Sequence, residues 1–330
     1  MKSTWVDFQS PLAQAIESFL AYKRSLRCHY DTEEKALRLL DRYLVERQIS
    51  LISEITAEVL DSFLSSRPRA RPRSYNHLLG VIHRLFGWMV NREIIDYSPL
   101  QAKPRRATKS RIPYLFDVSS AKLLLEVAEK LPDNSRAPLR GASYRMIFAI
   151  LFGLGLRVGE VSRLYLKDLD LDRDLLIIRD TKFDKSRLVP FGPRMAEALR
   201  EYLVLREKCW GLGDPDAAVF SFTRGKPIHP GTISQTFHHV VPHLHLVVRP
   251  GGSLPCVHDL RHSFAVATLL RWYRSGVKPA DKLLHLSTFL GHVDPASTAV
   301  YLTITAELLQ EANQRFASYA GSVFAERVVT

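Results

Sequence analysis

The sequence is poor in cysteine. Its three cysteines, Cys28, Cys209 and Cys256, lie far apart in a chain of 330 residues. An odd number of widely spaced cysteines argues against a disulfide framework and indicates reduced thiols, as in a cytoplasm. No stretch approaches the roughly 20 uncharged apolar residues that a membrane span requires. The first residues reach Asp7 before any long apolar run, so we expect no secretory signal and a cytoplasmic protein.

Acidic residues are also in short supply. The chain has 46 lysines and arginines against 34 aspartates and glutamates, which gives a net charge of +12 and a sequence pI of about 9.7. Such a surface attracts polyanions, of which nucleic acid is the commonest. Charge alone does not separate a nucleic-acid-binding protein from a merely soluble basic one, and both interpretations stay open at this point.

The length predicts two domains, because one hydrophobic core rarely serves more than about 200 residues. Residues 1–100 have the apolar spacing of a helical domain that begins near residue 10. The clearest helical periodicity runs from Tyr75 to Met89, and the residues 96–99, ending in Ser-Pro, are expected to stop that helix. We expect no room for a further domain before residue 10.

Two strongly basic segments accompany this domain. The first is a proline-containing loop over residues 67–73, and the second is a linker over residues 101–113 that separates the domains. Exposed arginines in stiff segments suit phosphate contact, although a solvated loop is the alternative for the first segment. The candidate DNA-binding residues are Arg67, Arg69, Arg71, Arg73, Lys103, Arg105, Arg106, Lys109 and Arg111.

Residues 114–330 are expected to form a second, mainly helical domain with a small antiparallel β-sheet. Helices are predicted near residues 119–131 and 143–153, and a tail helix within about 303–330. Short apolar runs predict three strands, at residues 175–178, 187–190 and 218–222. The fold class is therefore mainly α with a small antiparallel sheet.

Four short patterns in this second domain carry chemistry, although each is weak alone. Gly155–Glu160 places an arginine at a helix start, and residues 181–190 form a lysine-containing hairpin. In His258–Phe264, a histidine and an arginine three residues apart share one helical face. Residues 290–292, Leu-Gly-His, precede Tyr301 by nine residues. A cation beside an imidazole is costly to build unless an anion lies between them.

In order and spacing, these patterns resemble the tyrosine recombinase (phage integrase) family. The resemblance covers the whole second domain, and it extends more loosely to the first, which looks like the family's core-binding domain. Two departures are Leu154 and Gly159, where the family commonly has threonine and serine. The matching catalytic positions are Arg157, Lys182, His258, Arg261, His292 and Tyr301.

The resemblance implies that Arg157 and Arg261 clamp the non-bridging oxygens of a DNA phosphate, which suits their paired, permanently charged donors. His292 would add a hydrogen bond to the same phosphate. Glu160 is either a supporting residue that orients a catalytic neighbour or an exposed helix carboxylate. The arginines do much of what a metal would do, so we expect no metal and no cofactor.

Tyr301 is the expected nucleophile, and the resemblance implies a 3′-phosphotyrosyl intermediate. His258 is the candidate general base, and Lys182 is the candidate general acid, with Lys185 as a rival. His262 lies outside this pattern and is expected only to pack or bond locally. One phosphodiester is exchanged for another, so the reaction does not require ATP.

The expected function is site-specific recombination of double-stranded DNA, for a mobile element, by a homo-tetramer or by an assembly with related recombinases. Two alternatives remain: a DNA relaxer resembling type IB topoisomerases, and a non-catalytic DNA-binding regulator. The complete set of catalytic residue types argues against the regulator. A cluster of four histidines over residues 238–245 could bind zinc, but Pro242 interrupts it and no cysteine or acidic ligand lies near.

Overall fold

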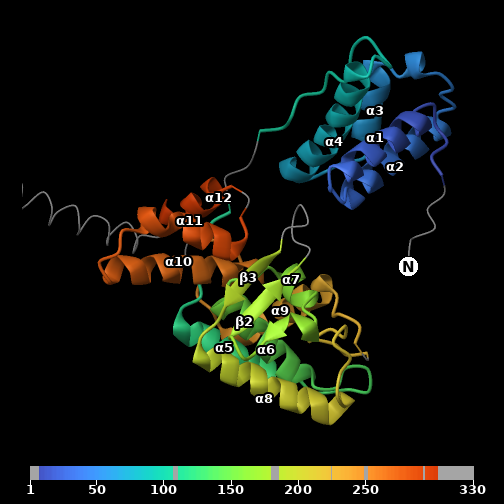
Figure 1. The fold of residues 1–330 in the computed structure, drawn as a ribbon. Coiled ribbons are helices and arrows are strands. Elements are labelled where there is room, and N and C mark those ends of the chain that lie inside the picture. The colour runs from blue at the N-terminus through green and yellow to red at the C-terminus, as the bar shows by residue number, and fades with distance from the viewer. Residues whose placement is uncertain are drawn as a thin grey trace, which may run out of the picture. The chain divides into compact units, whose positions relative to one another are not determined.

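The computed structural model describes residues 7–106, 111–179, 186–223, 225–248, 252–292 and 294–303 (Figure 1). The chain divides into two compact units, residues 1–110 and 111–330. This division falls inside the basic segment predicted as a linker. The fold prediction is confirmed: the described residues are mostly helical, with one three-stranded antiparallel sheet. None of the helices in these ranges is long and apolar enough to cross a membrane.

The first unit is a group of helices around one apolar core. Its longest helix, α4, presents Leu78, Ile82, Leu85 and Met89 at helical spacing, and all four are buried. Pro72 occupies the first turn of α4, where a missing N–H costs nothing. The elements of this unit are α1 (Ala13–Ser25), α2 (Asp31–Glu46), η1 (Ile52–Glu54), α3 (Ala57–Ser66) and α4 (Pro72–Asn91).

Two boundaries of α4 differ from the sequence-based prediction. The helix begins at Pro72, so Arg73 is helical and does not belong to the loop. The helix ends at Asn91, five residues before the predicted stop. The N–H of Ile94 turns back to the carbonyl of Met89, and Glu93 takes a left-handed φ of 56°. This closure needs no glycine or proline, so no residue type marks it in advance.

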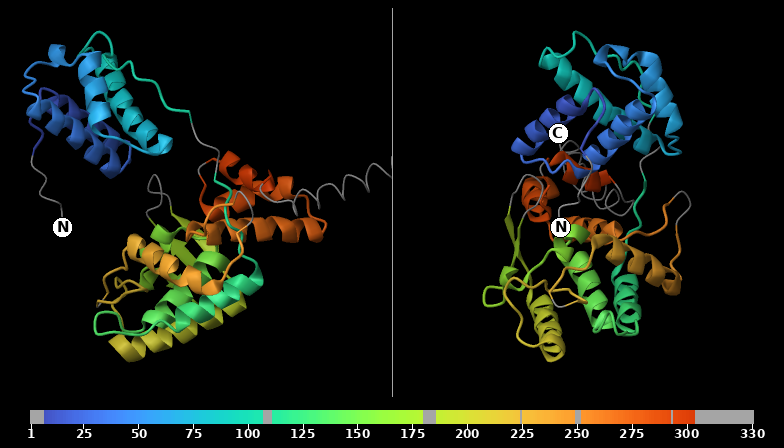
Figure 2. Two further views of the ribbon diagram at one scale, coloured as in Figure 1. Left: turned by 180° about the vertical axis from the view of Figure 1, so that it is seen from behind. Right: turned by 90° about the vertical axis from the view of Figure 1, so that its right-hand side faces the viewer.

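The second unit contains the sheet and the remaining helices (Figure 2). Prolines in the first turn of α8, α9 and α11 mark where these helices begin. Its helices are α5 (Val118–Glu129), α6 (Arg140–Gly153), α7 (Val158–Ser162), η2 (Leu166–Asp168), α8 (Pro193–Trp210), α9 (Pro230–Val240), η3 (Val241–Leu244), α10 (His258–Arg274), α11 (Pro279–Leu290), α12 (Ala296–Ala299) and η4 (Val300–Thr303).

The sheet has the order β1 (Leu169–Asp170), β2 (Leu175–Ile178) and β3 (Arg187–Pro190), with antiparallel pairing throughout. Two of the predicted strands are therefore confirmed. The predicted strand at residues 218–222 is wrong. Its apolar residues are buried, but the segment pairs only through an isolated bridge and single hydrogen bonds, to the chain after α7 and to residues 225 and 228. An apolar run without a continuous strand edge beside it forms no ladder.

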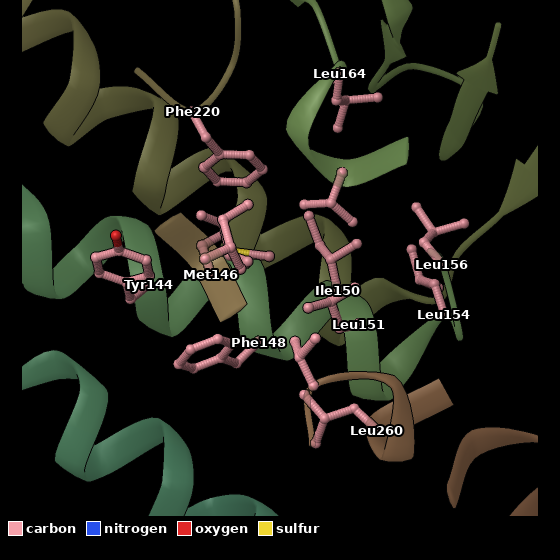
Figure 3. Close-up of a cluster of buried hydrophobic side chains, with 14 of the residues drawn as sticks. Tyr144, Met146, Phe148, Ile150, Leu151, Leu154, Leu156, Leu164, Phe220 and Leu260 are labelled. Atoms are coloured by element: carbon pink, nitrogen blue, oxygen red, sulfur yellow. The ribbon is translucent and has the colours of Figure 1, made fainter. Parts of the chain in front are cut away.

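The core of the second unit surrounds α6 (Figure 3). Most of this helix is buried, including Tyr144, Ile147, Phe148 and Leu151, as expected for a central helix. Leu260 of α10 joins the same core, which fixes the first turns of α10 against α6. A smaller apolar cluster lies between α10, α11 and η4, and it contains the ring of Tyr301.

Candidate active site

Arg157 caps the first turn of α7. Its backbone N–H and its Nη1 donate to the carboxylate of Glu160 at 2.9 and 2.8 Å. Its Nη2 donates to the carbonyl of Gly291 at 2.7 Å. The side chain is nevertheless 36% exposed. The guanidinium is thus held in one orientation while one side of it remains accessible to a ligand.

Arg261 lies on α10 and is 1% exposed. Its Nη1 donates to the carbonyl of Gly155, and its Nη2 donates to the carbonyl of Leu290, both at 2.7 Å. Its buried Nε has no hydrogen-bond partner among the described residues. Burial, followed by the charge of Arg157, lowers the pKa of Arg261 to about 10, so it stays charged near neutral pH.

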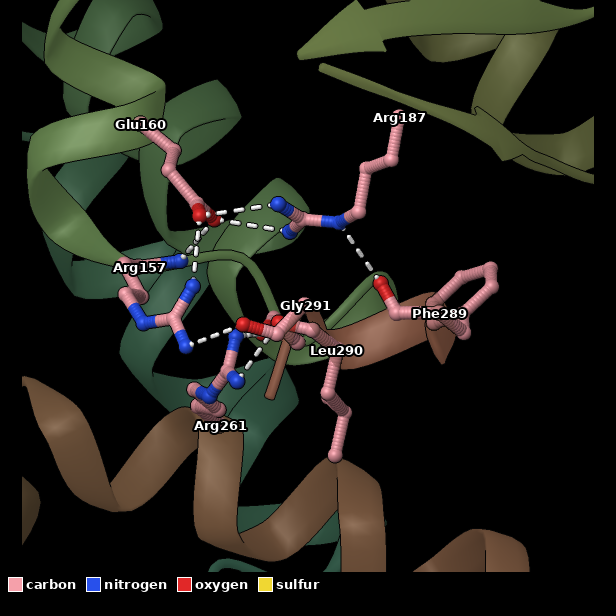
Figure 4. Close-up of polar contacts among 8 residues, drawn as sticks. Arg157, Glu160, Arg187, Arg261, Phe289, Leu290 and Gly291 are labelled. Carbon is pink, nitrogen blue, oxygen red and sulfur yellow. Dashed lines mark hydrogen bonds and ion pairs between the residues drawn. The ribbon is translucent and has the colours of Figure 1, made fainter. Parts of the chain in front are cut away.

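Three arginines converge on the C-terminal end of α11 (Figure 4). Arg187, Arg261 and Arg157 donate to the carbonyls of three consecutive residues, 289, 290 and 291. Carbonyls at a helix C-terminus have no partner within the helix and carry a partial negative charge, so cations suit them. Gly291 is required here, because it has a φ of +68° and a Cβ would lie 2.7 Å from Arg187.

Glu160 is the only carboxylate in this group of arginines as drawn in Figure 4, and it is 6% exposed. Both of its oxygens accept from Arg187 at 2.9 Å, while Arg157 donates to it from the other side. The alternative of an exposed helix carboxylate is therefore wrong. Arg187, which sequence reasoning missed, joins β3 to Glu160 and to the end of α11. It lies inside the predicted hairpin, at the start of the second predicted strand, but nothing local marked it as part of the site.

Burial raises the pKa of Glu160, but hydrogen bonds and charge from Arg187 and Arg157 outweigh it and lower the pKa to about 2. A folded-state pKa below the unfolded value of about 4.5 means that the ionised form stabilises the fold by about 3 kcal/mol near neutral pH. This contribution is complete above the unfolded pKa and is lost as the pH falls through the folded pKa.

We therefore expect Glu160→Gln to lower the free energy of unfolding by about 3 kcal/mol near neutral pH, since it leaves two arginines without their anion. Urea unfolding of the full chain measures the change. The gap to wild type should narrow as the pH falls from about 5 towards 3. The exposed Glu129, which pairs with Arg145 at 3.5 Å, supplies the control. Glu129→Gln should cost less than about 1 kcal/mol, and equal costs for the two variants would contradict the assigned role of Glu160.

The phenol of Tyr301 is enclosed by imidazoles. Its hydroxyl lies 3.0 Å from Nδ1 of His262, and its ring stacks on His292 with centroids 6.3 Å apart. The ring of Tyr301 is 4% exposed. Burial raises the pKa of its phenol, while the positive charges of Arg261 and Arg157 partly oppose that rise. The phenol oxygen is thus bound by the residue that follows Arg261 in α10.

The three histidines have different surroundings. His292 hydrogen-bonds through Nδ1 to the buried Thr298 at 2.6 Å, and His262 meets the edge of His258 with centroids 4.6 Å apart. His258 itself is exposed at the surface. Loss of hydration, followed by nearby positive groups, lowers the pKa of each imidazole to about 4. All three are therefore neutral at physiological pH.

Several predicted site residues lie outside the described residues or away from this group. Lys182, the rival Lys185 and Lys109 fall in segments that the structure does not describe, as does most of the predicted tail helix. Arg111 donates to the buried Asp259 at 2.6 Å and to the carbonyl of Leu254. Its guanidinium is thus already engaged, although its side chain is 40% exposed.

The remaining basic candidates lie on the first unit. Arg71, Arg73, Lys103 and Arg106 are exposed, and Arg67 and Arg69 are partly buried. Arg105 joins the two basic segments: its Nη1 donates to the carbonyl of Arg69, and its guanidinium lies 4.0 Å from the centre of the Tyr75 ring. The side chain of Asn76 pairs with the backbone N–H and carbonyl of Arg105. Residues 67–73 and 103–106 therefore form one basic surface.

The described part of the chain contains no group of three His, Cys, Asp or Glu residues that could hold a metal ion. The histidines at 238–245 fall into two elements, because α9 ends at Val240 and a 3₁₀ turn containing Pro242 follows. The chemistry that the group around Arg157, Arg261 and Tyr301 can perform is phosphate binding by arginines beside a tyrosine hydroxyl.

Residues 121–307 match the phage integrase family. A protein of Sinorhizobium fredii named as the integrase/recombinase y4rB is 32% identical over 311 residues, which cover 93% of this chain and 97% of that protein. The tyrosine recombinase XerC of Pelobacter propionicus is 27% identical over 304 residues, covering 87% and 92%. Among solved structures, the Tn1549 transposon integrase with a circular intermediate DNA has a TM-score of 0.64 at 16% identity, covering 94% of this chain and 100% of that chain. This last likeness shows a shared fold.

Proposed function

The chain belongs to the phage integrase family, and from that premise we propose that it is a site-specific recombinase that cuts and rejoins DNA through a covalent bond to Tyr301. The observation that carries the proposal is that Arg157 and Arg261 bind consecutive carbonyls at the end of α11, while the Tyr301 hydroxyl bonds to the residue after Arg261. Two fixed guanidiniums beside a phenol provide what attack on a phosphodiester needs: charge for the non-bridging oxygens, and a nucleophile.

The proposed reaction begins when the Tyr301 oxygen attacks the scissile phosphorus and its proton passes to a histidine of the site. Arg157 and Arg261 bind the non-bridging oxygens, where negative charge accumulates, and His292 adds a hydrogen bond to them. The bond between phosphorus and the 5′ oxygen breaks, and that oxygen takes a proton from Lys182 or its rival Lys185. The products are a 3′-phosphotyrosyl bond and a free 5′ hydroxyl.

Rejoining is the reverse step with a different 5′ hydroxyl. Because each phosphodiester is exchanged for a phosphotyrosyl bond and back, ATP is not needed. The arginines supply the positive charge that a metal would otherwise bring, so we propose a metal-independent reaction. Exchange between two duplexes requires four cleavages, each of which uses one Tyr301. We therefore propose a tetramer on DNA, of this chain alone or with related recombinases.

The basic surface of the first unit is the proposed DNA contact of residues 1–100. Its exposed cations, Arg71, Arg73, Lys103 and Arg106, carry no acidic partner in the structure's described residues. The Asn76 and Tyr75 contacts fix Arg105 within the same surface. Phosphate contacts of this kind supply affinity and position without reading sequence.

Residues 114–330 are the proposed catalytic domain, acting for a mobile element.

The test starts from a pool of duplexes with randomised sequence, because the DNA site is unidentified. Wild-type protein should convert some members of the pool into adducts that survive denaturation, and sequencing these adducts gives a site. A nicked duplex of that site should then trap the protein on the 3′ phosphate, leaving a 5′ hydroxyl that a polynucleotide kinase can label.

The alternatives give different outcomes in the same experiment. A regulator would retain DNA through denaturant-sensitive binding only, and it would form no adduct. A topoisomerase-like relaxer would form the adduct and relax supercoiled plasmid, but it would not join strands of two separate duplexes. Strand exchange between two labelled duplexes that carry the recovered site is the result expected of a recombinase.

A further inference from the structure

Within the site, the hydroxyl of Tyr301 is bound by His262. The 3.0 Å separation of the phenol oxygen and Nδ1 is that of a hydrogen bond. The two rings are tilted at 59° with centroids 5.5 Å apart, so the contact is made at the edge of the imidazole. This histidine is absent from the six positions that the family resemblance picked out.

The fold holds both partners in place. His262 lies one turn after His258 and one residue after Arg261, whose burial fixes the first turns of α10. Tyr301 belongs to η4, which packs on α10, and its ring is buried with Leu269 and Leu286. The packing of η4 on α10 therefore places the phenol oxygen beside His262. The contact does not depend on the rotamer of an exposed side chain.

We propose that His262 accepts the proton of Tyr301 as the phenol oxygen attacks phosphorus. The inference rests on the proposed function and deepens it. In this step the O–H bond of Tyr301 breaks, its proton forms an N–H bond at Nδ1 of His262, and the phenol oxygen forms the bond to phosphorus. The 5′ oxygen departs with a proton from the lysine of the hairpin, so charge and atoms balance.

The protonation state of His262 suits this role. Burial, followed by neighbouring positive groups, lowers its pKa to about 4, so the ring is neutral near physiological pH and one ring nitrogen is free to accept. A bound phosphate would bring negative charge close by and make the ring a stronger base. The groups facing His262 are His258, Arg261, Arg111, His292 and Tyr301.

His258 has a different position. It is exposed at the surface, and the contact that the structure gives it is the ring edge of His262, not the phenol. A group on the open side of the site is placed to meet the incoming DNA phosphate. We therefore assign proton acceptance from Tyr301 to His262. His258 is assigned to contact with the DNA phosphate.

The closing experiment compares substitutions of single histidines by single-turnover cleavage of the recovered nicked duplex across a range of pH. In His262→Asn, the amide can occupy the place of Nδ1 and bond to the phenol, but it cannot take a proton. In His262→Leu, both functions are lost. His258→Asn makes the same change at the other candidate base. His239→Asn, on the exposed face of α9, is the control outside the site.

We expect His262→Asn to cleave about 100-fold more slowly than wild type near neutral pH. Its rate should rise steadily with pH, because the phenol must then ionise without help, whereas the wild-type rate should level off above the pKa of the imidazole. A 5′-bridging sulfur leaves without a proton, so it should rescue loss of the general acid but not His262→Asn. His262→Leu should be slower still, and His239→Asn should stay within about twofold of wild type.

A wild-type rate and pH profile in His262→Asn would overturn the inference. So would a steadily rising profile in His258→Asn with a normal one in His262→Asn, because the base would then be His258. Either result would leave the adduct, and with it the proposed function, intact. Failure of wild type to form any adduct would instead remove the proposed function.

Discussion

Tyr301→Phe is expected to bind DNA as wild type does and to form no covalent adduct. The substitution keeps the ring, which is 4% exposed and packed in the cluster between α10, α11 and η4. It removes only the hydroxyl and its hydrogen bond to His262, which should cost the fold about 1 kcal/mol. Cleavage should fall below detection, because the proposed nucleophile is gone.

The control for this prediction is another tyrosine of the same cluster. Tyr273 of α10 is partly buried against it and receives the same substitution in Tyr273→Phe. Denaturing gels of the nicked-duplex reaction should show the adduct with wild type and with Tyr273→Phe, but not with Tyr301→Phe. Native gels check that all three proteins bind DNA. An adduct that persists in Tyr301→Phe would mean that the nucleophile is a different residue.

Much of the candidate site could be predicted because its residue types lie in short, ordered patterns. The spacing of His258 and Arg261 already implied one face of a helix, and the structure places both in the first turn of α10. Gly291 was expected to let the chain turn, and it does so with a positive φ after α11. These features depend on neighbours within a few residues, which a single sequence displays.

Contacts between distant segments could not be predicted in this way. Arg187 and Glu160 are 27 residues apart, and His262 and Tyr301 are 39 apart. Nothing local distinguishes Arg187 from a surface arginine at a strand end. His262 did carry one signal, because it lies four residues after His258 and so shares its face of α10. That spacing indicates proximity, but only packing of η4 on α10 shows which histidine the phenol meets.

The same limit explains the errors in the fold. Residues 218–222 are as apolar as a buried strand, and Val219 and Phe220 are buried. Whether such a run becomes a strand depends on a partner edge elsewhere in the chain. Here the run forms only an isolated bridge, whereas β1, whose two residues give no strand signal, pairs with β2 in register Leu169 to Leu176.

The second large effect concerns Arg261. Arg261→Lys should slow adduct formation on the order of 1000-fold, because one ammonium cannot replace two donors fixed on the Gly155 and Leu290 carbonyls and still present a third to phosphate. Affinity for DNA should change little, since one contact is lost among many phosphate contacts. Arg271→Lys, at an exposed position on the same helix, should stay within about twofold of wild type.

Loss of activity in Arg261→Lys has two possible causes, and the scissile linkage can separate them. In the first, Arg261 is needed to neutralise the negative charge of a non-bridging oxygen. A methylphosphonate, which replaces that oxygen with a methyl group, carries no such charge and would then not need Arg261. The gap between wild type and Arg261→Lys should then shrink by at least about tenfold. If Arg261 serves only to join α10 to residues 155 and 290, the gap should be the same on both linkages. Because the buried Nε has no partner among the described residues, we expect the gap to shrink: a buried donor left unpaired is costly unless a ligand comes to bind it.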